Sequence, residues 1–403
     1  MGKRDWEEEA LSNEDLDEML DEQEVNPKPR FTIKYVRYLL LMIMAMVAIL
    51  FLIGNRDLIN GDNFRRLMTK INVGFSAPAA ENGTVYLDVT GGGETVVYKD
   101  GFASATVEKL LITDKNGTEF QNTPLGFREP RLVANDKYVM AYDCGGTGVL
   151  IADSFSVLFE TTMSDNIVTA KMTPSGAFVV VTEGDGYLSK VFVFDSSFHE
   201  VYRYNSLSRY ILDADLSDDG KSMAVSAMNI EGADIVAEIL YFKLNKEEVQ
   251  WTVSYDQNPC IHLDIKNNDS ICGLFSWGMV SLNAKGTEQG QYKLDNQVLQ
   301  CFNVDDEDKT VFAVSAAESG NTTLVVCNEK GVVKDTVDLD YYAVRIDYCD
   351  GRIAALGSRK CSIYNTNGKL LWEGTPERAT GVAFMEKNAV VLIGETKCVY
   401  SAI

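Results

Sequence analysis

The chain has 403 residues, of which 46% are hydrophobic, and its formal net charge is −22. That hydrophobic content is typical of a globular protein, so disorder does not describe most of the chain. A strongly acidic surface repels the phosphates of nucleic acids and anionic lipid headgroups, which excludes both as expected partners. The length suits two ordinary domains or one large all-β unit.

Residues 1–30 are expected to be a disordered, cytoplasmic, acidic tail, because residues 1–24 carry eleven acids and only two bases. Within the tail, residues 12–20 begin with a capping-box pattern, Ser12-Asn-Glu-Asp15, followed by apolar residues at helical spacing. The segment is either a transient helix in a solubilising tail or a weak docking helix for a cytoplasmic partner. Its shortness favours the transient helix.

Residues 31–55 are predicted to be a basic flank and a membrane-spanning helix. The run from Tyr38 to Asn55 holds 18 residues without a charge, about 27 Å of helix, which is enough for a bilayer core. The preceding region is too long and acidic for a cleaved signal peptide, so the helix is expected to remain as an anchor. Four bases lie in residues 28–37 and two, Arg56 and Arg65, lie in the ten residues after the run. This bias favours a cytoplasmic N-terminus and an extracytoplasmic C-terminal domain.

Residues 56–80 are expected to be a juxtamembrane stalk, either a helix lying on the membrane surface or a simple spacer. From residue 81 to residue 403 the pattern changes to short runs rich in Val, Ile, Phe and Tyr that are separated by turn residues. Such punctuation predicts an all-β sandwich, barrel or propeller.

Two families of turns repeat through residues 81–403 with one rhythm. Turns that join two apolar strands are spaced by 39, 44, 49, 39, 43 and 37 residues, at Asp136, Ser175, Asp219, Asn268, Glu307, Asp350 and Lys387. Turns that precede a more polar strand are spaced by 39, 42, 49, 39, 45 and 37 residues, at Asn116, Phe155, Ser197, Lys246, Lys285, Lys330 and Asn367. The shared period of about 40 residues predicts four-stranded antiparallel sheets, the blades of a β-propeller.

Three of these turns also carry a family resemblance. Thr173-Pro-Ser-Gly176 and Ser217-Asp-Asp-Gly-Lys221 resemble the first-hairpin turns of WD40-like and PQQ-like propellers, and Asn365-Thr-Asn-Gly-Lys-Leu-Leu-Trp372 resembles their last hairpin. The Trp-Asp dipeptide and the Gly-His pair of true WD40 repeats are absent from the sequence. With its predicted anchor, the chain further resembles uncharacterised single-pass membrane-anchored propeller proteins of Gram-positive bacteria.

Seven blades are expected, or eight if residues 84–120 form a blade of their own. The last repeat, from Val382 to Ile403, supplies two strands and a third. An N-terminal strand is expected to complete that blade, because the pairing would remove both open sheet edges.

Few residues suggest chemistry. His199 lies in a turn and His262 in a strand, and two such positions predict neither a Ser-His-Asp set nor a metal cluster. The segment Asp213-Ala-Asp-Leu-Ser-Asp-Asp-Gly220 has oxygen ligands in a row, but strand alternation and turn chemistry are preferred over calcium because the EF-hand spacing is missing. Gly91-Gly-Gly93 lacks the Lys-Ser/Thr of a phosphate-binding loop, so it is interpreted as a turn.

The cysteines, tryptophans and sequons have structural interpretations. The eight cysteines form no Cys-x-x-Cys pair and are expected to be mostly buried free thiols, with one or two disulfides at most (Cys144, Cys260, Cys272, Cys301, Cys327, Cys349, Cys361 and Cys398). Three tryptophans fall in separate repeats, as core residues would (Trp251, Trp277 and Trp372). Sequons begin at Asn82, Asn116 and Asn321, and the first two also read as Asn-Gly hairpin turns.

The sequence therefore predicts a membrane-anchored, extracytoplasmic β-propeller that acts as a non-catalytic scaffold. Its loops are expected to bind a protein or another component of the cell envelope, with cationic partners favoured by the acidic surface. No catalytic, cofactor-binding or metal-binding residue is predicted, and no cofactor. The alternative is a propeller enzyme at the membrane surface, either a quinone-dependent dehydrogenase or a glycan-active enzyme.

Overall fold

The computed structural model describes a short N-terminal part and nearly all of the repeat region. The described residues are 33–54, 61–63, 65–66, 84–86 and 93–402, with gaps at 232–233, 257, 267–268, 305–308, 317–319, 377 and 387–388. The predicted tail (1–30), its segment 12–20 and most of the stalk lie outside the described residues. The chain divides into two compact units, Met1–Leu67 and Met68–Ile403.

The first unit contains the helix α2 (Ile33–Gly54), which is 22 residues long. It covers the uncharged run from Tyr38 almost to its end, since straight-chain and branched apolar residues without Pro allow an uninterrupted helix. Every side chain from Tyr38 to Val47 is exposed. No helix within the described residues has the combined length and apolarity of a membrane span.

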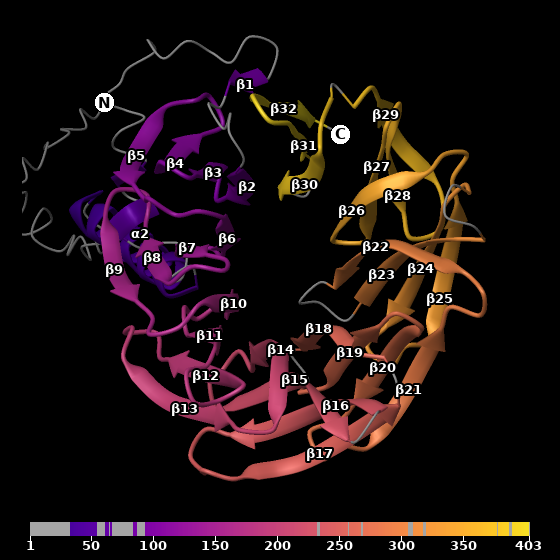
Figure 1. Ribbon diagram of the computed structural model, residues 1–403. Coiled ribbons are helices and arrows are strands. Elements are labelled where there is room, and N and C mark those ends of the chain that lie inside the picture. The colour runs from indigo at the N-terminus through magenta and orange to yellow at the C-terminus, as the bar shows by residue number, and fades with distance from the viewer. Residues whose placement is uncertain are drawn as a thin grey trace, which may run out of the picture. The chain divides into compact units, whose positions relative to one another are not determined.

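The second unit is a ring of four-stranded antiparallel sheets, eight of them in the described residues (Figure 1). Blade 1 comprises β2 (Gly93–Tyr98), β3 (Gly101–Thr106), β4 (Lys109–Asp114) and β5 (Glu119–Pro124), and blade 2 comprises β6 (Pro130–Ala134), β7 (Val139–Asp143), β8 (Gly148–Ala152) and β9 (Val157–Thr162). Blade 3 comprises β10 (Ile167–Met172), β11 (Phe178–Glu183), β12 (Ser189–Phe194) and β13 (Glu200–Ser206), and blade 4 comprises β14 (Arg209–Leu216), β15 (Ser222–Glu231), β16 (Asp234–Lys243) and β17 (Val249–Asp256). Blade 5 comprises β18 (Cys260–Ile265), β19 (Ile271–Phe275), β20 (Gly278–Leu282) and β21 (Glu288–Lys293), and blade 6 comprises β22 (Val298–Val304), β23 (Lys309–Ser315), β24 (Thr323–Asn328) and β25 (Val333–Asp338). Blade 7 comprises β26 (Ala343–Cys349), β27 (Arg352–Gly357), β28 (Cys361–Asn365) and β29 (Leu370–Gly374), and blade 8 comprises β30 (Gly381–Glu386), β31 (Ala389–Ile393), β32 (Lys397–Ala402) and β1 (Thr84–Tyr86). The predicted propeller of four-stranded blades is confirmed.

The ring closes as the sequence predicted. Strand β1 pairs antiparallel with β32, with Thr84 opposite Val399 and Tyr86 opposite Lys397, so the N-terminal strand completes the last blade. Figure 1 shows β1 beside β32, next to the first blade. Because the first and last strands of the domain pair in one sheet, the ring is closed without a covalent bond.

The expected count of seven blades is wrong, and the alternative of eight is right. The additional blade is β2–β5, whose first hairpin turns at Lys99-Asp100, with Tyr98 opposite Gly101. Lys99 has a φ of 54°, a left-handed conformation that this turn requires and that Asn or Gly adopts more readily. Gly101 is required in the strand, because a Cβ there would lie within 2.0 Å of the carbonyl oxygen of Thr113.

Side-chain oxygens fix the predicted turns between the third and fourth strands of the blades. Asp114 Oδ1 accepts hydrogen bonds from the backbone N–H of Asn116 at 2.9 Å and of Thr118 at 2.8 Å. Asn283 Oδ1 accepts the equivalent pair of N–H groups, from Lys285 and Thr287. These side chains satisfy backbone donors that the ladder leaves free, which is why Asp and Asn recur at this position.

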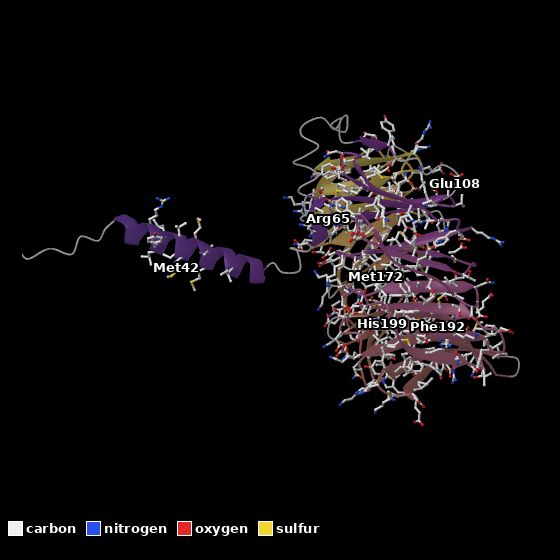
Figure 2. All side chains as sticks on the ribbon, turned by 90° about the vertical axis from the view of Figure 1, so that its left-hand side faces the viewer. Met42, Arg65, Glu108, Met172, Phe192 and His199 are labelled. Atoms are coloured by element: carbon white, nitrogen blue, oxygen red, sulfur yellow. The ribbon has the colours of Figure 1, made fainter. Side chains whose placement is uncertain are left out.

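The two ends of the strands define two faces of the propeller. The lower face carries the turns between first and second strands and between third and fourth strands; the upper face carries the turns between second and third strands and the connections between blades. Figure 2 shows Glu108, in the β3–β4 connection, at one face, and Met172 and His199 toward the opposite face.

The hydrophobic core lies between neighbouring blades. Second and third strands such as β7 and β20 are buried along their whole length, whereas outer strands such as β9 and β25 alternate between exposed and half-buried residues. None of the eight cysteines, all of which lie in the described residues, forms a disulfide, and five are buried (Cys260, Cys272, Cys327, Cys361 and Cys398). Burial raises the pKa of the Cys260 and Cys272 thiols to about 12, which keeps them protonated and unreactive.

Candidate functional site

The candidate site lies where the first strands of blades 4 and 5 meet. Residues alternate between the two sides of a strand, so Asp213 and Asp215 of β14 point the same way, toward β18. Asp213 Oδ2 accepts the backbone N–H of Leu263 at 2.8 Å, and Asp215 Oδ2 accepts that of Ile265 at 2.7 Å. Two carboxylates therefore hold the edge of one blade against the next.

Acidic side chains hold two other junctions of the ring in the same way. Glu94 of β2 accepts the backbone N–H of Leu132 at 2.6 Å, and Asp347 of β26 accepts that of Phe384 at 2.7 Å. The second carboxylate oxygen of Asp347 accepts a hydrogen bond from the amide of Asn303 at 2.8 Å. Acids on first strands thus have a structural role, because each satisfies a backbone donor in the neighbouring blade.

Two buried lysines distinguish the β14–β18 junction. The Lys171 ammonium, on β10, lies 2.6 Å from Asp213 Oδ2 and also donates to the carbonyl oxygen of Leu263. The Lys266 ammonium lies 2.7 Å from Asp264 Oδ2, and the Lys266 side chain is only 1% exposed. That second contact is ionic rather than a directed hydrogen bond, since the buried Oδ2 of Asp264 accepts no hydrogen bond of good geometry.

Burial and charge shift the pKa values of this cluster in opposite directions. Burial raises the pKa of Asp215 to about 7, although the Lys171 charge opposes the shift. Burial lowers the pKa of His262 to about 3, and the Lys171 charge adds to that effect. The pKa of Lys171 is raised, because attraction to Asp213 and Asp215 outweighs a burial that disfavours its charge. At neutral pH His262 is therefore neutral, Lys171 is charged, and Asp215 is close to half-protonated.

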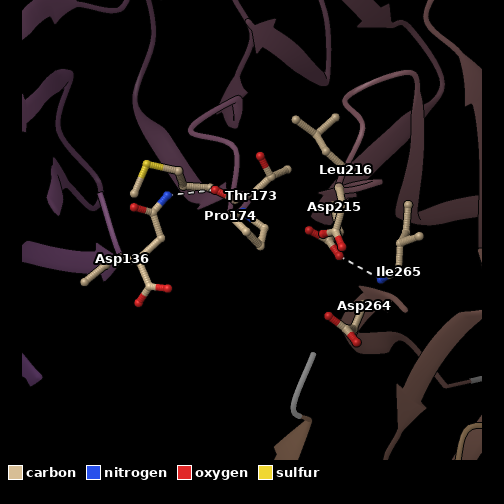
Figure 3. A pocket seen from close by; sticks show the side chains of 11 residues that line it. Asp136, Thr173, Pro174, Asp215, Leu216, Asp264 and Ile265 are labelled. Atoms are coloured by element: carbon tan, nitrogen blue, oxygen red, sulfur yellow. Dashed lines mark hydrogen bonds between the residues drawn. The ribbon is translucent and has the colours of Figure 1, made fainter. Parts of the chain in front are cut away.

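A pocket of about 280 Å³ opens on this cluster from the lower face. Its lining includes the carboxylates of Asp136, Asp215, Asp218 and Asp264, together with Met172 and other residues from the ends of β6, β10, β14 and β18. Figure 3 shows Asp215 and Asp264 on neighbouring strands at one side of the pocket and Asp136 at the other. The pocket accepts cationic or hydrogen-bond-donating groups and disfavours anions.

The predicted calcium alternative at residues 213–220 gains no support from the described residues. Asp213 and Asp215 lie in β14, as strand alternation predicted, and Ser217–Lys221 form the β14–β15 turn, in which Ser217 donates to Asp219 at 2.8 Å. Nowhere in the described part of the chain do three or more His, Cys, Asp or Glu side chains gather so as to hold a metal.

The other sequence candidates lie apart from one another. His199 is exposed in the β12–β13 turn, and His262 Nδ1 lies 3.6 Å from Asp213 Oδ2, beyond hydrogen-bond reach. Gly93 begins β2, whereas the other two glycines of that run and Asn82 lie outside the described residues. The Asn116-Gly117 sequon forms the predicted β4–β5 turn.

The tryptophans pack within separate blades, as predicted. Trp251 stacks on Tyr241 with ring centroids 5.1 Å apart, and Trp277 stacks on Phe275 at the same distance. Trp372 lies on the outer strand β29 and contacts a core cluster. The three rings do not form one stacking platform. Lys171, Asp264 and Lys266 were not singled out from the sequence. Lys171 pairs with Asp213 in another blade, and Asp264 pairs with Lys266 in its own blade, so neither pair forms a recognisable motif.

A family model, described as a family of unknown function (DUF5711), matches residues 82–399. The chain belongs to this family. No curated protein matches the sequence.

Solved structures confirm that the fold is a propeller of the WD40 and BamB kind. The C-terminal WD40 domain of Sif2 aligns with a TM-score of 0.57 at 10% identity, over 79% of this chain and 98% of that one. BamB from Moraxella catarrhalis aligns with a TM-score of 0.54 at 10% identity, also over 79% of this chain and 98% of its own. At such identities the similarity concerns the fold alone.

Proposed function

We propose that this protein is a non-catalytic binding scaffold, held at the outer surface of a cell membrane by its N-terminal helix. The observation that carries the binding function is a set of exposed large apolar side chains on the upper face. They belong to connections between strands or to strand ends there (Val107, Tyr187, Leu207, Tyr210, Ile230, Ile235, Ile261, Val298, Tyr342 and Val344). Among the described residues, fewer such side chains are exposed on the lower face (Val157, Leu158, Val201, Val332, Val333, Leu370 and Leu371), and this difference favours the upper face as an interaction surface.

The membrane part of the proposal rests on residues 38–55. The run contains no charged residue, and the exposed side chains of α2 from Tyr38 to Val47 include no polar group other than the Tyr38 hydroxyl. Burial of these side chains in lipid would remove a large apolar area from water. The bases at residues 28–37 favour a cytoplasmic N-terminus.

Membrane attachment is tested with the full chain in its own cells. Extraction at high pH should leave the protein in the membrane fraction, and protease added outside spheroplasts should digest the propeller but not the tail. The double variant Leu41→Lys, Val47→Lys should reduce the membrane-bound fraction, because each central lysine costs about 2.5–3.5 kcal/mol on insertion. Release of the unaltered chain by high pH would contradict the proposal.

Binding is tested by chemical cross-linking in the same membranes. A partner should be recovered at a constant ratio to the full chain, and a control chain that ends at residue 83 should not recover it. Recovery of the same proteins by both chains would contradict a binding role for the propeller.

An acid–base enzyme is the alternative that one observation favours. The Asp215 carboxyl has a pKa raised to about 7 by burial and lines the 280 Å³ pocket, which suits a general acid or base. The purified full chain can be assayed for hydrolysis of chromogenic glycosides and for reduction of an electron-accepting dye. Activity that is lost in the variant Asp215→Asn would replace our proposal with this one. We expect equal, background rates for both proteins.

A further inference from the structure

The β15–β16 hairpin projects from the upper face of blade 4. Both strands are ten residues long, against five in β7 and seven in β23, the equivalent second strands of blades 2 and 6. They stay paired up to Glu231 and Asp234, whereas β14 begins opposite Asn229 and β17 ends opposite Val236. The paired residues 230–231 and 234–235 therefore extend beyond both neighbouring strands.

The projecting end of this hairpin is apolar. Ile230 and Ile235 are cross-strand partners and are 55% and 45% exposed. Leu207 (73% exposed) and Tyr210 (40%) lie in the adjacent connection and at the start of β14, and Tyr187 (37%) lies in the β11–β12 connection of blade 3. We call these five residues the hairpin patch.

One hydrogen bond joins the two blades of the hairpin patch, and a second holds its connections within blade 3. Ser189 Oγ, next to the β11–β12 connection, accepts the backbone N–H of Ile211 at 3.0 Å. Leu188 N–H donates to the carbonyl oxygen of Ser206, immediately before Leu207, at 2.8 Å. The hairpin patch is therefore presented by a connected framework rather than by independent loops.

Acidic residues border the hairpin patch. Glu183, at the end of β11, and Asp185, in the β11–β12 connection two residues before Tyr187, are both exposed. The bases on the bordering strands are already in ion pairs, Lys190 with Asp165 at 2.7 Å and Arg209 with Glu238. The local field is therefore negative, and it complements a positively charged partner.

The chain enters the propeller from the other face. Tyr86, the last residue of β1, pairs with Lys397, the first residue of β32, at the upper end of that strand. Since β1 runs toward the upper face, its first residue, Thr84, lies on the lower side. The hairpin patch thus lies on the opposite face from the first described residue of the propeller.

We propose that the hairpin patch binds a basic, amphipathic segment of a partner protein. This inference rests on the proposed binding function and specifies the partner's chemistry. The apolar side of such a segment would cover Ile230, Ile235 and Tyr210, and its Lys and Arg side chains would meet the bordering acids. The alternative occupants, an uncharged or acidic segment, would leave those acids without counter-charges.

Site-specific photo-cross-linking of the full chain in its own membranes tests this inference. A photo-reactive phenylalanine analogue replaces Tyr210, and the cross-linked peptide is sequenced by mass spectrometry. We expect one partner segment with a net positive charge and apolar residues at helical spacing. The double variant Ile230→Ser, Ile235→Ser should lower the yield at least about fivefold.

A matched control lies on the lower face, at the β24–β25 turn. Val332 and Val333 are 52% and 42% exposed, close to the values of Ile230 and Ile235. The double variant Val332→Ser, Val333→Ser should leave the yield unchanged. An acidic or wholly polar cross-linked segment, or equal losses in both double variants, would overturn the inference.

The inference and the proposed function fail in different ways. If an analogue at Val332 gives cross-links and an analogue at Tyr210 does not, the inference about the hairpin patch is wrong. The proposal that the propeller is a binding scaffold would still hold. The absence of a partner at both positions, together with a negative chemical cross-linking result, would overturn both.

Discussion

The β26–β30 and β14–β18 junctions of the propeller use the same device, but they differ greatly in charge. At β26–β30 one carboxylate, Asp347, accepts the backbone N–H of the next blade, and its second oxygen is satisfied by the neutral amide of Asn303. At β14–β18 two carboxylates perform that role, and Asp213 is also paired with the buried ammonium of Lys171.

The difference indicates that stability alone does not explain the second junction. One acid per junction is sufficient to satisfy a backbone donor, as Glu94 also shows between β2 and β6. Buried ion pairs seldom stabilise a fold more than apolar residues of similar volume, because both charges lose their hydration. The additional charges at β14–β18 lie beside a pocket whose lining includes four acidic residues, Asp215 and Asp264 of this junction among them, and therefore mark this junction as the candidate site.

The largest expected difference between the junctions concerns the loss of one acid. Asp213→Ala would remove the carboxylate in contact with the Lys171 ammonium and the acceptor of the Leu263 N–H, at a cost of about 3–5 kcal/mol in unfolding free energy. Asp347→Ala would leave the backbone N–H of Phe384 and the amide of Asn303 without their acceptor, at a cost of about 1–3 kcal/mol. Denaturant titration of both variants measures the two losses of unfolding free energy.

The double variant Asp213→Ala, Lys171→Met is the control for that prediction. Removal of the ammonium together with its partner should recover part of the loss, because no uncompensated charge remains. Equal losses in the two single variants, or no recovery in the double variant, would show that the extra charge at β14–β18 is energetically unimportant.

The pH dependence of stability should also separate the junctions. Because the pKa of Asp215 is raised from 3.8 to about 7 by burial, the folded state holds a proton that the unfolded state releases. This contribution to stability is complete below pH 4 and is lost as the pH rises toward 7. The stability of wild type relative to Asp215→Asn should therefore fall by about 4 kcal/mol between pH 4 and pH 8.

Glu94→Gln provides the matched variant at the other type of junction. The pKa of Glu94 is also raised, mainly by burial, although the hydrogen bond from Leu132 opposes the shift. We expect the same direction of pH dependence. Thermal unfolding between pH 4 and pH 8 measures both, and a pH-independent difference for Asp215→Asn would contradict the assignment.

The repeat architecture could be predicted because turn chemistry is local. An Asp or Asn that accepts backbone N–H groups two and four residues later, such as Asp114 or Asn283, leaves the same pattern in every repeat. The first blade was missed as a separate unit because its hairpin places Lys99 in a left-handed conformation that sequence patterns assign to Asn or Gly.

The candidate site could not be predicted because its contacts join residues about 50 positions apart. Asp213 and Asp215 bond to Leu263 and Ile265, and their separation equals one repeat. The alternation of acids in β14 was visible, but the position of Lys171 against Asp213 depends on how the blades are registered around the ring. Aligned repeats would have placed Asp213 and Lys171 on neighbouring first strands, which is the signal that sequence reasoning left unused.

The smallest expected effect concerns turns outside the first strands. It tests whether the β14–β18 and β26–β30 junctions differ only in their first strands. Asp195, in blade 3, accepts the backbone N–H of Ser197 at 2.8 Å and of His199 at 2.9 Å, and Asn365, in blade 7, accepts that of Lys369 at 2.8 Å. Replacement of either by Ala should cost about 1 kcal/mol, since exposed turn donors regain water when they lose their acceptor. Equal losses of unfolding free energy in denaturant titration would confine the difference between the junctions to the first strands. A much larger loss for Asp195→Ala would mean that blades 3 to 5 as a whole differ from the rest of the ring, and not only the β14–β18 junction.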